Sequence, residues 1–361
     1  MISGSAYLMI YLFIVTVYTL VVYTNYRNTT VSVYKERSKN ATLILAILLT
    51  LFIGTRPYDP VFVDTVGYVA SYKSLLGEAF HFNWDVENLL FDNLFSYFAS
   101  RTLGCTSLFL IIAAIYYIGT FIACKKFFPN NVLAAYIVFL GAFSTFSYSV
   151  NGIKAGAAAA IFLCALANRE KKWQSIVLVL ISWGFHHSMS LCVVGYLAVF
   201  IYSKPKWYFI FWFFCLSMAI GHVTYFQTFF SKMSDAKGVR YLDADNMAGW
   251  SGRTGLRLDF IIYSFMPILV GYIAIFKKKI ESVLYNKLLS LYLFTNGVWL
   301  LCMYASFTNR IAYLSWFMYP IVLIYPFLSQ DCSWRSVYGY KLFSVIILLH
   351  LCFTLFMNLI Y

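Results

Sequence analysis

The sequence predicts an all-α polytopic membrane protein, a single integral-membrane domain over residues 1–361 with about 12 transmembrane or re-entrant helices. Composition is the first observation: 61% of the residues are hydrophobic and 11% are charged, far from the balance of an ordinary soluble domain. The second is that apolar runs near or above the ~20 residues needed to cross a bilayer recur along the whole chain. An outer-membrane barrel would instead show alternating segments of ~10 residues.

Clusters of Lys and Arg separate the apolar runs and indicate which side of the membrane each helix end faces. They hold 17 of the 27 Lys and Arg residues, and only four acidic residues lie on the same side: Glu36, Glu170, Glu281 and Asp331. By the positive-inside rule these clusters are cytoplasmic, which accounts for the formal net charge of +13 without a nucleic-acid partner. The clusters are residues 27–39, 125–126, 169–172, 204–206, 277–287 and 335–341.

Threading the chain through these clusters predicts the elements in order. A first span near residues 6–23 and a return to Thr55 precede an outer segment over 56–104, which includes an amphipathic helix around residues 89–98. A second outer segment covers residues 225–258. The Ala-rich span over 154–168 carries small residues that admit a neighbouring backbone, so it should be an interior helix. The other spans are expected at about 105–123, 131–148, 207–224, 259–276, 287–304, 311–329 and 341–360.

His186 and His187 stand in the middle of residues 173–203, a stretch without Lys, Arg, Asp or Glu. Both flanks are basic and should be cytoplasmic, whereas one helix over residues 173–202 would be about 45 Å long in a ~30 Å hydrocarbon core. We therefore expect two shorter helices that meet near residues 184–190, with the histidines at the apex. Non-helical backbone at that depth is tolerated only inside protein or beside a wet cavity.

On this topology, unusual polar residues gather at the outer ends of the helices. Positive-inside statistics disfavour cations there, and an anionic partner such as a polyprenyl diphosphate would explain them. Each also has an ordinary interpretation, since a terminal Arg or Lys is commonly a headgroup anchor and a buried His is commonly a structural donor. Adjacent histidines do not share a helix face, and the cysteines form no CxxC pair, so neither a metal nor a cofactor is expected. The residues are Arg56, Asp64, Tyr68, Asn151, Lys154, His186, His187, Arg253, Arg257, Asn309 and Arg310.

Four motifs follow one another in a characteristic order. They are an Arg, an Asp and a Tyr in the first outer segment, "SYSVNGIK" before the Ala-rich helix, "FHHS" in the broken helix and a late "NRIAY". Over about residues 55–320 this order resembles the EpsG family, the Wzy-like polysaccharide polymerases of bacterial envelopes. Family members usually carry Arg-Gln where this chain has Lys154 and Ala155, and Lys keeps the charge of Arg without its bidentate geometry.

The resemblance implies a metal-independent glycosyltransferase with a GT-C-like helical bundle, in the bacterial inner membrane with its active site facing the periplasm. It would polymerise undecaprenyl-diphosphate-linked repeat units into O-antigen or exopolysaccharide, with one lipid-linked glycan as donor and another as acceptor. Membrane lipid and a chain-length regulator protein are further candidate partners. His187, directly before Ser188, is favoured as general base or hydroxyl-orienting group, with His186 and Asp64 as alternatives. Diphosphate binding is expected of Arg56, Arg253, Arg257 and Arg310, with Lys154 as a weaker candidate, and other substrate contacts of Tyr68, Asn151 and Asn309.

Two other classes of function stay open on the same residues. A lipid-linked glycan flippase also uses broken helices and buried cations, but its cations should line a cavity open to both faces, whereas these candidates lie in the outer half. A ligase or acyltransferase acting on the same carrier lipid would share the diphosphate site. Trp84, Tyr241 and Trp250, in the outer segments, suit stacking on sugar rings in any of these classes.

Overall fold

The computed structural model describes residues 3–31, 34–168, 170–232, 255–332 and 334–359, and every regular element among them is a helix. This confirms the predicted all-α class. The chain divides into two compact units, one formed by Met1–Ser190 with Phe327–Tyr361 and the other by Leu191–Pro326. The single domain over residues 1–361 stays a prediction.

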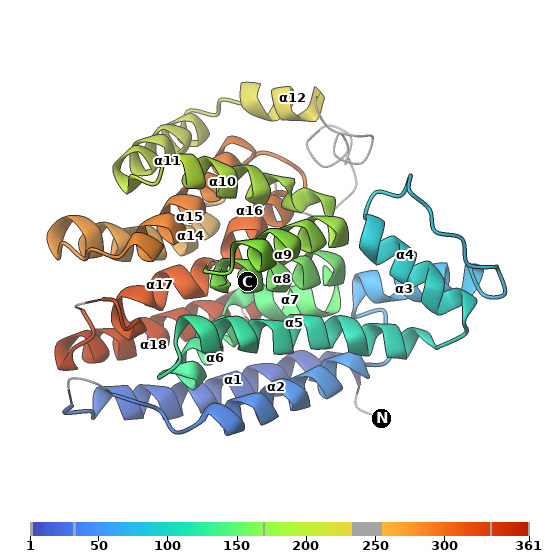
Figure 1. Ribbon diagram of the computed structural model, residues 1–361, viewed down its shortest axis with the longest axis horizontal. Coiled ribbons are helices and arrows are strands. Elements are labelled where there is room, and N and C mark those ends of the chain that lie inside the picture. The colour runs from blue at the N-terminus through green and yellow to red at the C-terminus, as the bar shows by residue number, and fades with distance from the viewer. Residues whose placement is uncertain (1–2, 32–33, 169, 233–254, 333, 360–361) are drawn as a thin grey trace. The chain divides into compact units, whose positions relative to one another are not determined.

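In the first unit, α2 and α8 pack on α5, and α18 packs on α1 (Figure 1). The predicted outer segment contributes α3 and α4, which lie beside the N-terminal end of α5 (Figure 1). Here α4 matches the predicted amphipathic helix, whereas α3 was not predicted. The helices are α1 (Gly4–Arg27), α2 (Lys39–Gly54), α3 (Val63–Ser74), α4 (Leu89–Ser100), α5 (Cys105–Phe127), α6 (Val132–Leu140), α7 (Phe143–Val150), α8 (Ile153–Ala167), α9 (Lys172–Phe185), η1 (His187–Met189) and α18 (Val337–Leu359).

The Ala-rich helix α8 is buried, as its small side chains predict. Ala157, Ala158, Ala159 and Ala160 are at most 1% exposed. A Cβ on Gly156 would lie 2.6 Å from the backbone oxygen of Tyr148, so only glycine fits the approach of α7 to α8. This packing holds the start of α8 directly against the end of α7.

The span predicted over 131–148 is two helices, α6 and α7, bent by 73° at Gly141 and Ala142. The apolar segment is therefore present where the span was predicted, but it is bent rather than one continuous helix. Side chains from neighbouring helices pair with the backbone carbonyls that the bend releases: Tyr11 donates to the carbonyl of Leu140 at 2.7 Å, and His350 pairs with that of Val138 at 3.0 Å. These partners allow non-helical backbone inside an apolar unit.

Glu36, between α1 and α2, binds the N-terminus of α6. Its carboxylate accepts from the backbone N–H groups of Leu133 at 2.8 Å and Ala134 at 3.2 Å, and from the Tyr26 hydroxyl at 3.0 Å. Desolvation by burial outweighs these bonds and raises the pKa of Glu36 from 4.5 to about 7. The carboxyl group is thus a local source of pH dependence.

We expect the stability of the protein to fall as the pH rises through the window from 4.5 to about 7, because the folded state holds a proton on Glu36 that the unfolded chain has released. A shift of this size corresponds to about 3 kcal/mol at most. Glu36→Gln should flatten this slope in thermal unfolding of the purified protein in detergent. Glu281→Gln, at an exposed glutamate, is the matched control. If stability depends on pH equally in wild type and in Glu36→Gln, Glu36 is not the source of the pH dependence.

In the second unit, α15 packs against α11, α14 and α16. Buried tryptophans fill its core with their indole N–H groups paired: Trp212 donates to Asn296 at 2.7 Å and Trp316 to Ser264 at 2.7 Å. The helices are α10 (Ser190–Ile201), α11 (Pro205–Ile220), α12 (Tyr225–Lys232), α14 (Leu258–Tyr272), the π-helix η3 (Ile273–Lys277), α15 (Val283–Leu301), α16 (Thr308–Trp316) and α17 (Tyr319–Leu328). Of the second outer segment, α12 is described and residues 233–254 lie outside the described residues.

Within the described part of the chain, five helical segments are long and apolar enough to cross a membrane, or six if the bent pair α6 and α7 is one span. They establish a multi-pass membrane protein. Shorter apolar helices, among them α2, α8 and α11, have 15 or 16 residues and rise only about 24 Å, less than a bilayer core. The predicted number of about 12 transmembrane or re-entrant helices exceeds these five or six spans largely because the prediction counted such short helices.

Candidate functional site

The histidine turn, residues 186–189, interrupts the helix at the predicted place. Helix α9 ends at Phe185, His186 is extended with φ −153° and ψ 118°, and a single 3-10 turn over His187–Met189 leads into α10. The Nδ1 atom of His186 accepts from the backbone N–H of Ser188 at 3.2 Å and pairs with its hydroxyl at 2.6 Å. This local capping explains why the helix stops here.

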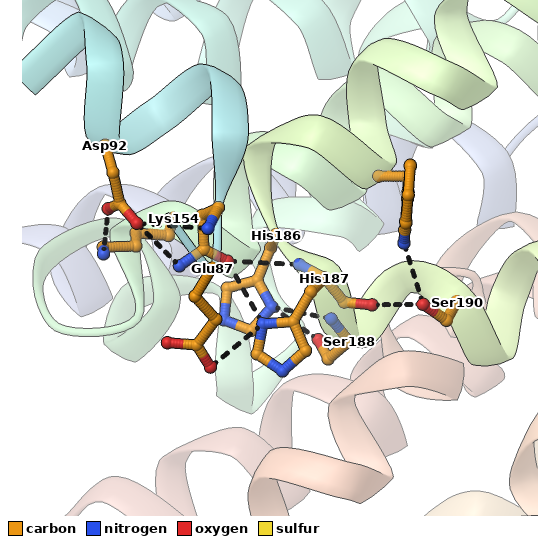
Figure 2. A network of polar contacts seen from close by, with 9 residues as sticks. Glu87, Asp92, Lys154, His186, His187, Ser188 and Ser190 are labelled. Atoms are coloured by element: carbon orange, nitrogen blue, oxygen red, sulfur yellow. Dashed lines mark hydrogen bonds and ion pairs between the residues drawn. The ribbon is translucent and has the colours of Figure 1, made fainter. Parts of the chain in front are cut away.

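The side chain of His187 is held from the segment that leads into α4. Its Nδ1 lies 3.2 Å from Oε1 of Glu87 and 3.3 Å from Oδ1 of Asn88, and its backbone N–H donates to the same Asn88 oxygen at 3.1 Å (Figure 2). Both neighbours of Nδ1 are acceptors, so Nδ1 carries the proton. The lone pair of the neutral ring is then on Nε2, and the side chain is 43% exposed.

His186 has the opposite tautomer. Because its Nδ1 accepts from Ser188, its proton is on Nε2. The two imidazole rings stack with centroids 5.1 Å apart and an interplanar angle of 18° (Figure 2). In their neutral forms the two stacked rings therefore differ: Nε2 of His187 carries a lone pair, whereas Nε2 of His186 carries a proton.

Lys154, at the start of α8, is linked to the histidine turn through α4. Its Nζ donates to Oδ1 of Asp92 at 2.6 Å, and Oδ2 of Asp92 accepts from the side chain and the backbone N–H of Asn88 at 3.3 and 3.1 Å (Figure 2). Asn88 in turn holds His187. A chain of polar contacts thus connects α8, α4 and the turn.

The end of α9 packs closely on α4 and fixes this arrangement. A Cβ on Gly184 would lie 2.7 Å from Cγ of Leu90, and the rings of Phe185 and Phe91 meet edge to face at 6.4 Å. The Lys154 ammonium lies 4.8 Å from the centroid of the same Phe91 ring. The apolar residues of α4 therefore place its polar residues against the turn.

Arg56, predicted to bind diphosphate, is 2% exposed and its guanidinium is engaged by the protein. Its Nη2 donates to Thr65 at 3.0 Å and to the carbonyl of Val150 at 3.1 Å, and its Nη1 donates to that of Ile53 at 3.0 Å. The Phe109 ring lies 4.5 Å away. Burial lowers the pKa of Arg56 to about 10, which still leaves it charged at neutral pH. The geometry fits a residue that joins α3 to the end of α7 rather than one that faces a substrate.

Three further predicted residues lie in the same unit. Asp64 and Tyr68 are one turn apart on α3, and the Tyr68 ring packs 6.1 Å from that of Phe91 and 6.0 Å from the Lys154 ammonium. Asn151 follows α7 directly after Val150, and its Oδ1 is buried without a hydrogen-bond partner among the described residues. The unit thus gathers the predicted outer-end residues from α3, α7, α8 and the histidine turn.

The remaining predicted cations belong to the second unit or lie outside the described residues. Arg257, before α14, forms a bidentate pair with Asp259 at 3.0 and 2.6 Å and lies 3.6 Å over the Phe260 ring. Asn309 and Arg310 are exposed in the first turn of α16. Arg253 lies outside the described residues.

Sequence reasoning missed Glu87, Asn88 and Asp92 as members of the site. The only signal was a helix start with an Asn and then an Asp four residues later, a pattern that normally indicates a local cap. In the structure the Asn88 side chain caps no backbone N–H of α4: its Nδ2 bonds Asp92, and its Oδ1 reaches the histidine turn, about 100 residues away in the chain. Within the described residues, no three His, Cys, Asp or Glu side chains are placed to hold a metal ion.

Comparison with known protein families identifies a match over most of the chain. The model of the EpsG family matches residues 39–361 of the chain, which include every helix of both units except α1. No curated protein and no solved structure matches significantly. The match includes all the candidate residues of the histidine turn, α4 and α8. The chain therefore belongs to the EpsG family, a family of polysaccharide polymerase-type membrane proteins.

Proposed function

We propose that the protein is a metal-independent membrane glycosyltransferase that polymerises undecaprenyl-diphosphate-linked oligosaccharide repeat units on the periplasmic face of the bacterial inner membrane. The EpsG match supports the reaction class. The observation that carries the mechanism is the position of His187, whose Nδ1 is turned to Glu87 and Asn88 so that Nε2 is the basic atom. O-antigen or exopolysaccharide would be the product.

In this mechanism His187 is the general base. Nε2 takes the proton of the acceptor sugar's hydroxyl as that oxygen forms a bond to the anomeric carbon of the donor. The bond between that carbon and the diphosphate oxygen breaks, and the lipid diphosphate leaves with the electron pair. Glu87 stabilises the imidazolium that forms, and the imidazolium then releases its proton to water. The Nε2–H of His186 orients the acceptor hydroxyl, and Asp64 is retained as a second candidate base.

Cations would stabilise the departing diphosphate. Arg310, exposed in the first turn of α16, lies where the partial positive charge of a helix N-terminus also favours an anion. Arg257 is less available, because Asp259 already engages it on two nitrogens. Arg253 is a further candidate for the same role. Tyr68, Asn151 and Asn309 are proposed as additional substrate contacts.

Lys154 is predicted to position Asn88 and His187 rather than to bind diphosphate, because Asp92 already engages its ammonium. We expect Lys154→Met and Asp92→Asn each to lower kcat about ten-fold, a change of about 1.4 kcal/mol, and to leave KM for the lipid-linked substrate unchanged. Either change would loosen Asn88 and hence His187. The double variant should be no slower than the single ones, because both act through one contact. A rise in KM in Lys154→Met alone would instead make Lys154 a diphosphate ligand.

The membrane arrangement is part of the proposal. The basic clusters between helices support a cytoplasmic inner face, and the short apolar helices would bring the number of membrane-inserted elements to about 12, in a GT-C-like bundle. Cysteine accessibility in intact cells tests the orientation: a Cys at position 87 should react with a membrane-impermeant maleimide from outside, and a Cys at position 37 should not. The reverse pattern would contradict it.

A carrier is the second candidate, favoured by the 73° break between α6 and α7, because broken helices also mark alternating-access transporters. Purified protein supplied only with lipid-linked repeat units in vesicles separates the classes. Chain growth supports the polymerase, translocation without growth supports a flippase, and neither without a further acceptor supports a ligase or acyltransferase. Absence of chain growth would overturn the proposal.

A further inference from the structure

A cavity of about 460 Å³ lies in the predicted outer segment, and its lining includes no residue of the histidine turn. Three residues of α4, namely Asn93, Ser96 and Ser100, form one side of it. The rest of the lining comes from Leu75 and residues 78–86, in the connection between α3 and α4. Its volume is within the range of small-molecule sites.

The connection is anchored by a reciprocal pair of amide bonds. The backbone N–H of Asn83 donates to Oδ1 of Asn93 at 2.7 Å, and Nδ2 of Asn93 donates back to the carbonyl of Asn83 at 2.9 Å. Asn93 is 6% exposed, and Oδ1 of Asn83 accepts from the backbone N–H of Asp85 at 2.8 Å. The cavity wall is therefore a built structure rather than a loose loop.

The lining has the chemistry of a sugar-binding site. Trp84 is 76% exposed and Phe82 is 45% exposed, and the two rings pack edge to face with centroids 4.8 Å apart, so aromatic surface remains accessible to a ligand. The C–H face of a pyranose packs on such rings, and the carboxylates of Glu78 and Asp85 accept hydrogen bonds from hydroxyls. The described residues that line the cavity include neither Lys nor Arg, which disfavours a diphosphate and favours a neutral or amino-substituted glycan.

The cavity adjoins the candidate catalytic turn. Val86 lines the cavity, and the next residue, Glu87, contacts His187; their Cα atoms are about 3.8 Å apart in any trans peptide. Asn88, at the start of α4, contacts the turn and is held by Asp92, whereas Asn93, Ser96 and Ser100 of α4 line the cavity. A glycan lying in the cavity would thus continue directly to the reacting hydroxyl or anomeric carbon.

We propose that this outer-segment cavity binds sugar residues of the lipid-linked glycan adjacent to those that react, with Trp84 as its stacking platform. The inference rests on the proposed function for the identity of its ligand. It adds a glycan subsite to the reaction centre. Such a subsite retains the growing chain between additions, so its loss shortens the product without preventing the first bond from forming.

Binding of lipid-free oligosaccharides to the purified full-length protein in detergent tests the subsite. The probe is a partial hydrolysate of the source cells' own polysaccharide, compared with maltohexaose. We expect Trp84→Ala to weaken binding about ten-fold or more and Glu78→Gln with Asp85→Asn to weaken it as well. Trp173→Ala, which removes another exposed tryptophan at the start of α9, is the matched control and should bind as wild type does. Equal binding by wild type and Trp84→Ala would overturn the proposal.

A second readout separates this proposal from the polymerase proposal. His187→Ala should bind the oligosaccharides normally although it makes no polymer. Trp84→Ala should still join two repeat units but yield shorter chains. If the wild-type protein binds the hydrolysate through Trp84 yet joins no units, the polymerase proposal fails and the subsite stands. If chains keep wild-type length in Trp84→Ala, the subsite fails and the polymerase proposal stands.

Discussion

His187→Ala is expected to abolish polymer formation by the purified protein while leaving the amount of folded protein unchanged. General-base catalysis contributes about 10²–10⁴-fold, so the rate of chain growth should fall by that range. The His187 side chain is 43% exposed, and its removal opens no core cavity. Gel analysis of the products from lipid-linked repeat units, together with the elution profile of the variant in detergent, measures both quantities.

Two variants at the same turn serve as controls for this result. Glu87→Gln keeps the shape of its side chain but removes the charge that stabilises the imidazolium, so a partial loss of about ten-fold is expected. His186→Ala removes an orienting donor and a contact to Ser188, and should retain more activity than His187→Ala. A ladder of normal chain lengths from His187→Ala would exclude His187 from the mechanism.

Arg56→Ala is expected to destabilise the protein by about 3 kcal/mol or more. The change removes a buried side chain together with its hydrogen bonds to Thr65 and to the carbonyls of Ile53 and Val150. It also weakens the junction between α3 and the end of α7, which then depends on the hydrogen bond from the Thr65 hydroxyl to the Val150 carbonyl at 3.1 Å. Thermal unfolding in detergent should shift down by several degrees, and activity should be lost in parallel with folded protein.

Arg101→Ala provides the matched control, because Arg101 is an exposed arginine in the same outer segment that lies over the ring of Tyr97. It should change neither the unfolding temperature nor the activity. The alternative role for Arg56, direct binding of diphosphate, has an opposite signature. If Arg56→Ala unfolds as the wild type does but has a raised KM for the lipid-linked substrate, Arg56 is a substrate ligand and the positioning role is wrong.

Hydropathy and charge predicted most of the helix positions because a bilayer imposes length and composition on every span. The break at the histidine turn was predictable on the same grounds, since two basic flanks and an overlong apolar stretch cannot be reconciled with one helix. The bend between α6 and α7 was not predictable. It depends on Tyr11 and His350, which come from helices far away in the sequence and satisfy the carbonyls of Leu140 and Val138.

The candidate site was predictable only in part, because its residues are held by partners from a different segment of the chain. Charge in an apolar context identified Lys154, His186 and His187, but not which groups would hold them. The partners Glu87 and Asp92 come from a polar outer segment in which an acidic residue is unremarkable by composition. Arg56 shows the opposite error. Charge statistics predicted that this cation binds diphosphate, whereas in the structure it is buried and bonded to Thr65 and to backbone carbonyls.

The account depends most on His187 as the proton acceptor, and chemical rescue by imidazole tests this directly. Imidazole added to purified His187→Ala with lipid-linked repeat units should restore chain growth in proportion to the concentration of the unprotonated form, because the free ring can occupy the space that the side chain leaves beside Glu87. The same additive should leave His186→Ala unchanged. Full chain growth by His187→Ala without imidazole, or equal stimulation of both variants, would contradict the account.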